Sequence, residues 1–148
     1  RNPTMSAQSS LPPFHLAFPV TDLEATRKFY VEVLGCEQGR EDEGNWIDFN
    51  FFGHQIVAHL VDVDEHQSVK SVSKVDGHGV PIPHFGAVLD WEAFDVLVEN
   101  LKKHKIKFEI EPYLRFEGKP GEQRTCFIFD PSKNALEFKT FKNKESLF

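Results

Sequence analysis

An internal repeat constrains the fold of this chain more than any other feature of its sequence. FHLAFPVTDLEATRKFYVEVLGC, at residues 14–36, is similar in pattern to PHFGAVLDWEAFDVLVENLKKHKI, at residues 83–106. Each segment opens with a short apolar strand that carries a histidine near its start, and a helical pattern follows. His15 and His84 are 69 residues apart. The sequence therefore predicts a module that occurs twice.

Each copy also carries an aspartate that is suited to capping a helix. These are Asp22 and Asp90, which are 68 residues apart and so keep nearly the same offset as the histidines. Apolar residues then recur at three- and four-residue spacing, as in a helix that lies on a sheet. Gly35 follows the first stripe, where a helix end is expected. The stripes consist of Leu23, Thr26, Phe29, Tyr30, Val33 and Leu34 in the first copy, and of Trp91, Phe94, Leu97, Val98 and Leu101 in the second.

Strand patterns follow each helix. In the first half they cover residues 46–52 and 55–63, and in the second half residues 106–116, 124–130 and 134–141. Each half thus predicts a strand, a helix and about three further strands. A single helix leaves one face of its sheet uncovered, so we expect the two halves to lie side by side around a shared cup.

The predicted fold class is α+β, with two paired βαβββ modules that form a cupped mixed sheet with the helices outside. A polar stretch rich in Ser, Lys, Gly and Pro separates the modules. The expected division is a disordered segment at 1–10, a first module at 11–63, a linker or lid at 64–82, a second module at 83–142 and a C-terminal tail at 143–148.

Composition excludes several classes of function. The net charge is −6 and no basic stripe occurs, so nucleic acid is not an expected partner. No apolar run reaches membrane-spanning length, and no signal-peptide core is present, so we expect a cytoplasmic protein without membrane contact. Cys36 and Cys126 form no short motif; we expect two reduced, packed thiols, with a disulfide as the alternative.

Strand alternation predicts which side chains face the cup. In each copy the histidine lies on the face opposite the apolar positions, beside small residues. In the last strand Leu136 and Phe138 belong to the core face, so Glu137 projects from the other. Two imidazoles and a carboxylate are a suitable ligand set for a divalent ion with open positions. A single strand histidine is more often a hydrogen-bonded core residue, but the equivalent placement of His15 and His84, together with Glu137, favours a metal site.

Further candidates surround this predicted site. Gln55 and His59 share a face of their strand, and we expect them to act as catalytic residues, His59 by exchanging a substrate proton. A solvated or structural role for His59 is the alternative. Arg115 and Arg124 are expected to bind an anionic substrate, although surface ion pairing explains them equally well. Asp48 either lines the cup, where it would contact the substrate, or faces water.

The motifs DLEATRKFYVEVLGC, PHFGAVL and DPSKNALEF resemble the glyoxalase, bleomycin-resistance and extradiol-dioxygenase superfamily, whose members are also called vicinal-oxygen-chelate proteins. The resemblance runs from about Leu11 to Phe141. It implies paired βαβββ modules and one divalent metal ion held by His15, His84 and Glu137. One departure is Lys133, at a turn position where the family usually has Gly and where a positive φ is expected.

The resemblance is closest to a group of predicted extradiol dioxygenases, because FHLAFPV, PHFGAVL and GHQIVAHL are similar to segments of that group. It implies a dioxygenase-like enzyme for a small aromatic or vicinally oxygenated substrate, with Fe2+ favoured over Mn2+, Zn2+, Ni2+ and Co2+. Isomerases of the family use a fourth carboxylate ligand late in the first half, and the corresponding strand here, GHQIVAHL, has no Glu or Asp before Asp62. A metal-dependent isomerase or lyase of glyoxalase type and a protein that sequesters a small ligand are the alternatives. A homodimer is expected, with modules that pair within or across chains.

Overall fold

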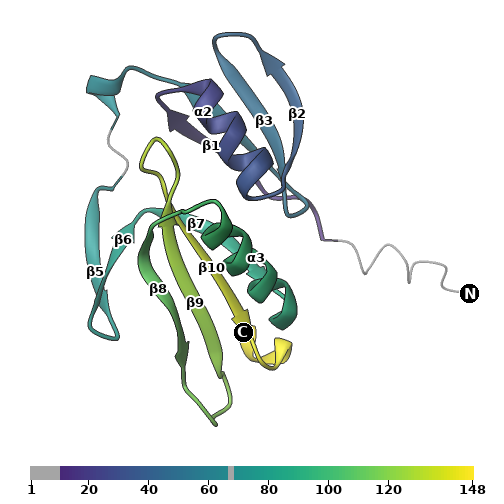
Figure 1. Ribbon diagram of the computed structural model, residues 1–148, viewed down its shortest axis with the longest axis vertical. Coiled ribbons are helices and arrows are strands. Elements are labelled where there is room, and N and C mark those ends of the chain that lie inside the picture. Colours follow the sequence, from purple (N-terminus) through teal and green to yellow (C-terminus); the bar gives the residue numbers. More distant parts are fainter. Residues whose placement is uncertain (1–10, 67–68) are drawn as a thin grey trace, which may run out of the picture.

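The computed structural model describes residues 11–66 and 69–148, and it contains two similar modules joined by a linker (Figure 1). The segment at 1–10, which was expected to be disordered, lies outside the described residues. The first module contains β1 (His15–Val20), the helix α2 (Leu23–Arg27) with its π-helical continuation η1 (Lys28–Val33), β2 (Glu37–Asp42), β3 (Trp46–Phe51) and β4 (His54–Leu60). The second contains β7 (His84–Leu89), α3 (Trp91–Lys103), β8 (Phe108–Arg115), β9 (Gln123–Phe129) and β10 (Ala135–Phe141).

The sheet topology confirms the predicted duplication. Each module has a four-stranded sheet, in the order β1-β4-β3-β2 in the first and β7-β10-β9-β8 in the second. In both modules the first strand pairs in parallel with the last, and the other pairs are antiparallel. The two sheets are not hydrogen-bonded into one, so the α+β cup is built from two sheets.

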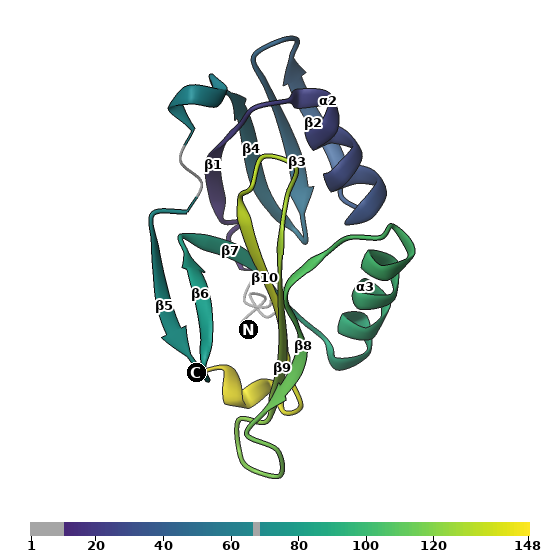
Figure 2. The same ribbon diagram turned by 60° about the vertical axis from the view of Figure 1, so that its left-hand side comes forward.

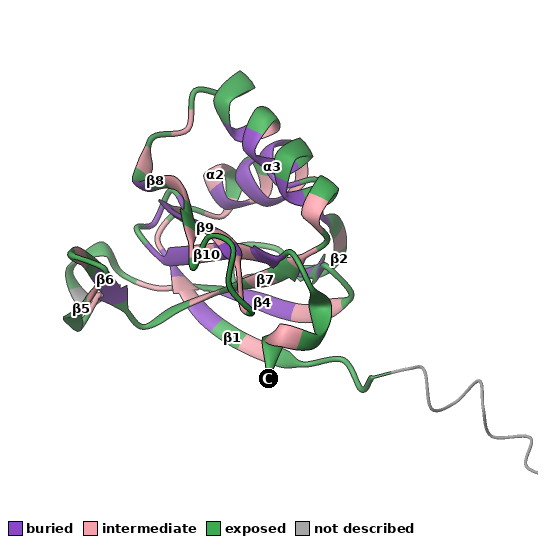
Figure 3. Ribbon diagram, turned by 90° about the horizontal axis from the view of Figure 1, so that it is seen from below, coloured by how far each residue is buried: buried purple, intermediate pink, exposed green. Residues whose placement is uncertain are grey.

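The helices cover only one face of the sheets. Figures 2 and 3 show α2 and α3 on the same side of the two sheets, and the buried residues gather between helices and strands. One aromatic core joins the modules there: Phe18 lies 5.3 Å from Phe85 and Phe51 lies 6.2 Å from Phe138, between ring centroids. This core leaves the opposite face of each sheet, called the open face below, without a helix.

Polar contacts add to the junction between the modules on the helix side. The hydroxyl of Tyr30 donates to Asp130 at 2.9 Å, and both residues are buried. Asn100, near the end of α3, donates to the backbone carbonyl of Val33 at 2.5 Å. Because these bonds connect residues that are 67 to 100 positions apart in sequence, they hold one module against the other.

The caps and turns agree with the sequence analysis in part. Asp22 accepts a hydrogen bond from the backbone N–H of Ala25 and caps α2, as expected. Asp90 stands at the N-cap of α3 without a capping bond, and its carboxylate pairs with Lys144 at 2.6 Å. Lys133 has the expected positive φ, of 63°.

Two strand regions were not predicted. β2 is polar and exposed, so its sequence has no apolar alternation. The predicted linker contains a hairpin of β5 (Ser71–Val75) and β6 (His78–Ile82), preceded by the short helix η2 (Val63–Glu65). The hairpin turns at Asp76 and Gly77, both with positive φ, and Asp-Gly is a typical sequence for such a turn.

The hairpin lies against the open face of the second sheet. Val80 packs on Ile110 and Phe127 in a small separate core. At the hairpin turn, Asp76 accepts a hydrogen bond from the hydroxyl of Tyr113 at 3.0 Å and pairs with Arg115. The hairpin therefore forms a wall beside the second module.

The remaining predictions concern the tail, the thiols and the membrane. The tail forms the short helix η3 (Lys144–Leu147). Cys36 and Cys126 are buried free thiols, which confirms the expectation of reduced cysteines in the described residues. In residues 11–66 and 69–148, no helix has the length and apolar character needed to cross a membrane.

Gly86 permits the close pairing of β7 with β10. A Cβ at this position would overlap the backbone carbonyl of Glu137, its register partner. We expect Gly86→Ala to separate the two strands and to lower the free energy of unfolding by more than about 2 kcal/mol. Urea denaturation measures this effect. Gly79→Ala is the control, because its Cβ would meet only a movable methyl group of Val72; an equal loss in both variants would contradict the account.

Candidate functional site

An imidazole and a carboxylate lie side by side on the open face of the second sheet. Leu136 and Phe138 are fully buried in the core on the helix side, so strand alternation turns Glu137 to the open face. β7 runs parallel to β10 and brings His84 to the same face. The Nε2 atom of His84 lies 3.2 Å from Oε1 of Glu137, as the sequence predicted for these two residues.

Hydrogen bonds fix the orientation of both groups. The Nδ1–H of His84 donates to the carbonyl of Pro81 at 2.8 Å, at the end of the hairpin. The hydroxyl of Thr125 donates to Oε2 of Glu137 at 2.5 Å, and the ammonium of Lys139 lies 3.6 Å from the same oxygen. The sequence analysis did not identify Pro81, Thr125 or Lys139. For Thr125 the signal was available, because antiparallel register places it on the face of Glu137.

The two groups shift each other's proton affinity. The hydrogen bond that His84 donates to Glu137 raises the pKa of His84 against the opposing effect of burial, with a smaller contribution from the carbonyl of Pro81. Burial opposes ionisation of Glu137, but the hydrogen bonds from His84 and Thr125 outweigh it and lower the pKa of that carboxyl. The pair is therefore stabilised as an imidazolium next to a carboxylate.

A second constellation lies on the open face of the first sheet. The Nδ1 atom of His15 lies 2.8 Å from Oε1 of Gln55, its register partner on β4. The amide of Gln55 donates in turn to Oδ2 of Asp48 at 3.3 Å. Asp48 is buried, and its other oxygen accepts the backbone N–H of Arg40. A Cβ at Gly39 would overlap this carboxylate, so glycine is needed there.

These contacts change the reading of Gln55 and Asp48. Both lie on the open face, as alternation indicated for Gln55 and left undecided for Asp48, and in the structure their polar atoms orient His15. Asp48 does not face water. Its contacts with Arg40 and Gln55 also leave it little freedom to bind a substrate directly.

The two constellations do not meet within one chain. Across residues 11–66 and 69–148, no group of three or more His, Cys, Asp or Glu side chains is close enough to hold a metal ion. The expected convergence of His15, His84 and Glu137 therefore does not occur within a single chain, and the alternative of modules that pair across chains stays a prediction. Alternation fixes the face of a strand to which a residue points, but it does not fix whether two faces of the same chain oppose each other.

His59 lies on the open face but far from His15. It pairs with Pro19 at the other end of β4, while His15 pairs with Gln55. His59 lies four positions after Gln55 along the strand, which corresponds to a distance of about 13 Å. His59 therefore lies too far away to contact a metal ion held by His15 of its own chain, and this position does not support its expected role as acid–base.

The two arginines lie on opposite faces of the second sheet. Arg124 is on the helix side, where its guanidinium stacks 4.0 Å from the ring of Trp91 and pairs with Asp95. The prediction that it binds substrate in the cup is wrong, because Arg124 lies one residue out of phase with the positions that face Glu137. Arg115 lies on the open face but is engaged by Asp76 of the hairpin.

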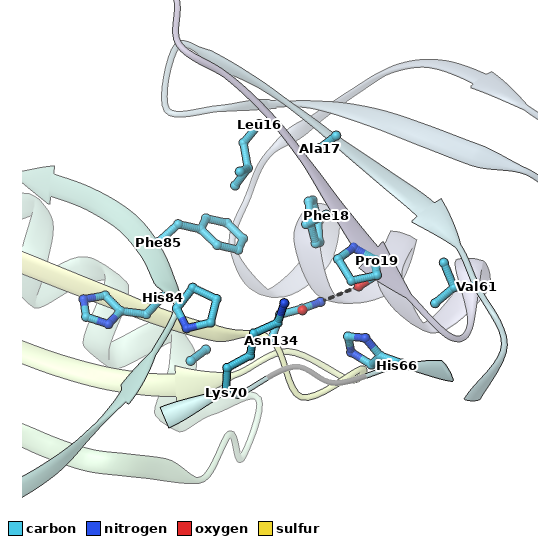
Figure 4. Close-up of a pocket in the computed structure, with 12 residues that line it drawn as sticks. Leu16, Ala17, Phe18, Pro19, Val61, His66, Lys70, His84, Phe85 and Asn134 are labelled. Atoms are coloured by element: carbon cyan, nitrogen blue, oxygen red, sulfur yellow. Dashed lines mark hydrogen bonds between the residues drawn. The ribbon is translucent and has the colours of Figure 1, made fainter. Parts of the chain in front are cut away.

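A cavity of about 510 Å3 separates β1 from β7 (Figure 4). Phe18, Phe85 and other apolar side chains form most of its lining, and Asn134 donates to the carbonyl of Pro19 there. His84 lies on its wall and also lines a smaller hollow of about 260 Å3 over β7 and β10, together with Glu137. His84 thus borders both the cavity and the smaller hollow, and each of them could hold a small molecule.

Comparisons with known proteins agree with this architecture. The family model described as "Glyoxalase/Bleomycin resistance protein/Dioxygenase superfamily" matches residues 13–138. A solved structure of a glyoxalase/bleomycin resistance protein/dioxygenase from Alicyclobacillus acidocaldarius is 36% identical, with a TM-score of 0.76 and coverage of 93% of this chain and 96% of that one. A search of the curated proteins gives no significant match.

Two more distant solved structures share the fold. Lactoylglutathione lyase from Agrobacterium tumefaciens is 20% identical, with a TM-score of 0.61 over 88% of this chain and 94% of that one. The fosfomycin resistance protein FosX from Listeria monocytogenes is 17% identical, with a TM-score of 0.67 over 94% and 99%. The fold, the duplicated module and the family match lead to one conclusion: the chain belongs to the glyoxalase/bleomycin resistance protein/dioxygenase superfamily.

Proposed function

We propose that this chain is a metal-dependent enzyme whose divalent ion is held by His84 and Glu137 of one copy and His15 of a second copy. The observation that carries the proposal is the presence of two incomplete sets of metal ligands, each on an open sheet face. His84 and Glu137 are oriented on the open face of the second sheet, and His15 is oriented on the open face of the first sheet. Within the described part of the chain, no third ligand reaches the pair of His84 and Glu137.

The donor atoms suit a metal ion. Both histidines donate their Nδ1–H to a carbonyl oxygen, of Gln55 for His15 and of Pro81 for His84. In the neutral imidazole, the form that binds a metal, this fixes the tautomer in which Nε2 carries the free lone pair, as in many histidines that bind metals. Thr125 similarly holds one oxygen of Glu137 and leaves the other directed at His84.

A twofold dimer would bring the partial sites together. If the open face of the first module meets the open face of the second module of another copy, twofold symmetry repeats that contact. Two identical sites then form, and each takes His15 from one copy and His84 with Glu137 from the other. The same contact would cover sheet faces that have no helix in the single chain.

The register also limits the number of protein ligands. Val57 pairs with Ala17 on the first module as Glu137 pairs with Gly86 on the second. The position that corresponds to Glu137 is therefore an apolar residue, and a fourth carboxylate is missing there. Two histidines and one carboxylate with open positions are the ligand set of non-heme Fe(II) oxygenases.

We therefore propose Fe2+ as the ion and an extradiol-type dioxygenation as the reaction. A bound divalent ion would act as a Lewis acid toward two adjacent oxygens of a small substrate. The chain itself would orient the ligands through Pro81, Thr125 and Gln55, and the open hollow beside Glu137 would hold the substrate.

Mixing two inactive variants tests the shared site. His15→Ala and His84→Ala should each lose stoichiometric metal. After denaturation and joint refolding, half of the dimers are mixed and one of their two sites is intact, so about a quarter of the metal content should return. Metal analysis of the refolded mixture by mass spectrometry measures this.

Each variant refolded alone is the control and should remain free of metal. No recovery in a mixture that is dimeric by light scattering would show that the ligands do not come from two copies, and full metal binding by His15→Ala would remove that residue from the site.

Thr125→Val should weaken metal binding about tenfold or more, because Glu137 loses the hydroxyl that orients it. Competition with a chromophoric chelator measures the affinity. Thr140→Val is a matched control on the helix side of the same sheet, where the hydroxyl is buried and bonds no described residue. Thr125→Ser should retain the wild-type affinity; an unchanged affinity in Thr125→Val would exclude this positioning role.

Oxygen uptake tests the reaction class. Protein loaded with Fe2+ under anaerobic conditions should consume oxygen when a catechol is added, and protein loaded with Zn2+ should not. An oxygen electrode measures the difference across a panel of catechols. If iron-loaded protein is inert across the panel but the zinc or nickel form isomerises or cleaves a substrate, the reaction is of the isomerase or lyase class instead.

A further inference from the structure

Lys139 is the one ammonium group that lines the hollow over β7 and β10, among the residues that the structure describes. It lies two residues after Glu137 on β10 and faces the same side of the sheet. Its Nζ atom is 3.6 Å from Oε2 of Glu137, and 28% of the side chain is exposed. It therefore stands next to the proposed ion and within reach of a ligand in the hollow.

The charges around Lys139 would not cancel once a metal ion is bound next to it. In the described residues, Glu137 is its only carboxylate partner, and that carboxylate also interacts with His84 and Thr125. A divalent ion would draw the charge of Glu137 to itself. With one carboxylate against a divalent ion and an ammonium, the site would keep an excess of two positive charges, and such a field attracts anions.

We propose that Lys139 binds an anionic group of the substrate, so that the preferred substrates are vicinally oxygenated carboxylates. This inference rests on the proposed metal site. It assigns to Lys139 the role that the sequence analysis gave to Arg124, whose guanidinium lies on the other face of the sheet. A charge-assisted bond between ammonium and carboxylate would also fix the orientation of the substrate relative to the ion.

Binding of two probes that differ by one carboxylate tests the proposal. Calorimetric titration of the protein loaded with Zn2+ would compare 3,4-dihydroxybenzoate with catechol, without any turnover. We expect the wild-type protein to bind the carboxylate about tenfold more tightly, which is the effect of one good charge-assisted bond. Lys139→Met should abolish this preference, while Lys139→Arg should retain part of it.

Lys142→Met is the matched control, because Lys142 is an exposed lysine that pairs with Glu122 and does not line the hollow. It should keep the wild-type preference. A preference that persists in Lys139→Met, or a wild-type protein that binds both probes equally or neither, overturns the inference. Metal analysis of the same samples separates the two proposals, since wild-type protein without zinc would refute the metal site itself, and the inference with it.

Discussion

Coverage of only one face of each sheet is the constraint on which the rest of the structure depends. Each module has a single helical segment, and the two segments pack on the same side, over a core that Tyr30 and Phe138 help to fill. The other faces of the sheets therefore have no helix. Polar side chains such as His15, Gln55 and Glu137 are tolerated there because a partner or solvent can reach them. Hydrogen bonds within each sheet orient these side chains.

The duplicated architecture gives the two histidines the same role by different means. Both stand at the start of a first strand beside a parallel last strand, and both donate Nδ1–H to a carbonyl. In the first module a side-chain amide supplies that carbonyl. In the second module the backbone of Pro81 supplies it, so the hairpin that joins the modules contributes directly to the site. The position of the hairpin therefore helps to fix the orientation of His84.

Much of the fold followed from the sequence, because helix and strand periods and the repeat are local patterns. The face of Glu137 was predicted for this reason, and the positive φ of Lys133 was expected from the glycine that the resembling family has at that turn. β2 was missed because an exposed polar strand has no alternation. The sequence left open whether the ligands meet within one chain or between copies, and whether Arg124 binds substrate or forms a surface ion pair, since neither the pairing of distant faces nor the phase of each strand is a local property. Asp76-Gly77 is a typical sequence for a hairpin turn, so the hairpin within the linker was also predictable from local sequence.

The account depends on a site completed by two copies of the chain, and the location of the bound ion tests it most directly. In a crystal structure of protein loaded with Co2+, the anomalous signal identifies the ion and its ligands without assumptions about the reaction. The account predicts one peak per chain, in contact with His84 and Glu137 of one copy and His15 of another. A peak whose protein ligands all belong to one chain, or one that does not contact His84 and Glu137, would contradict it.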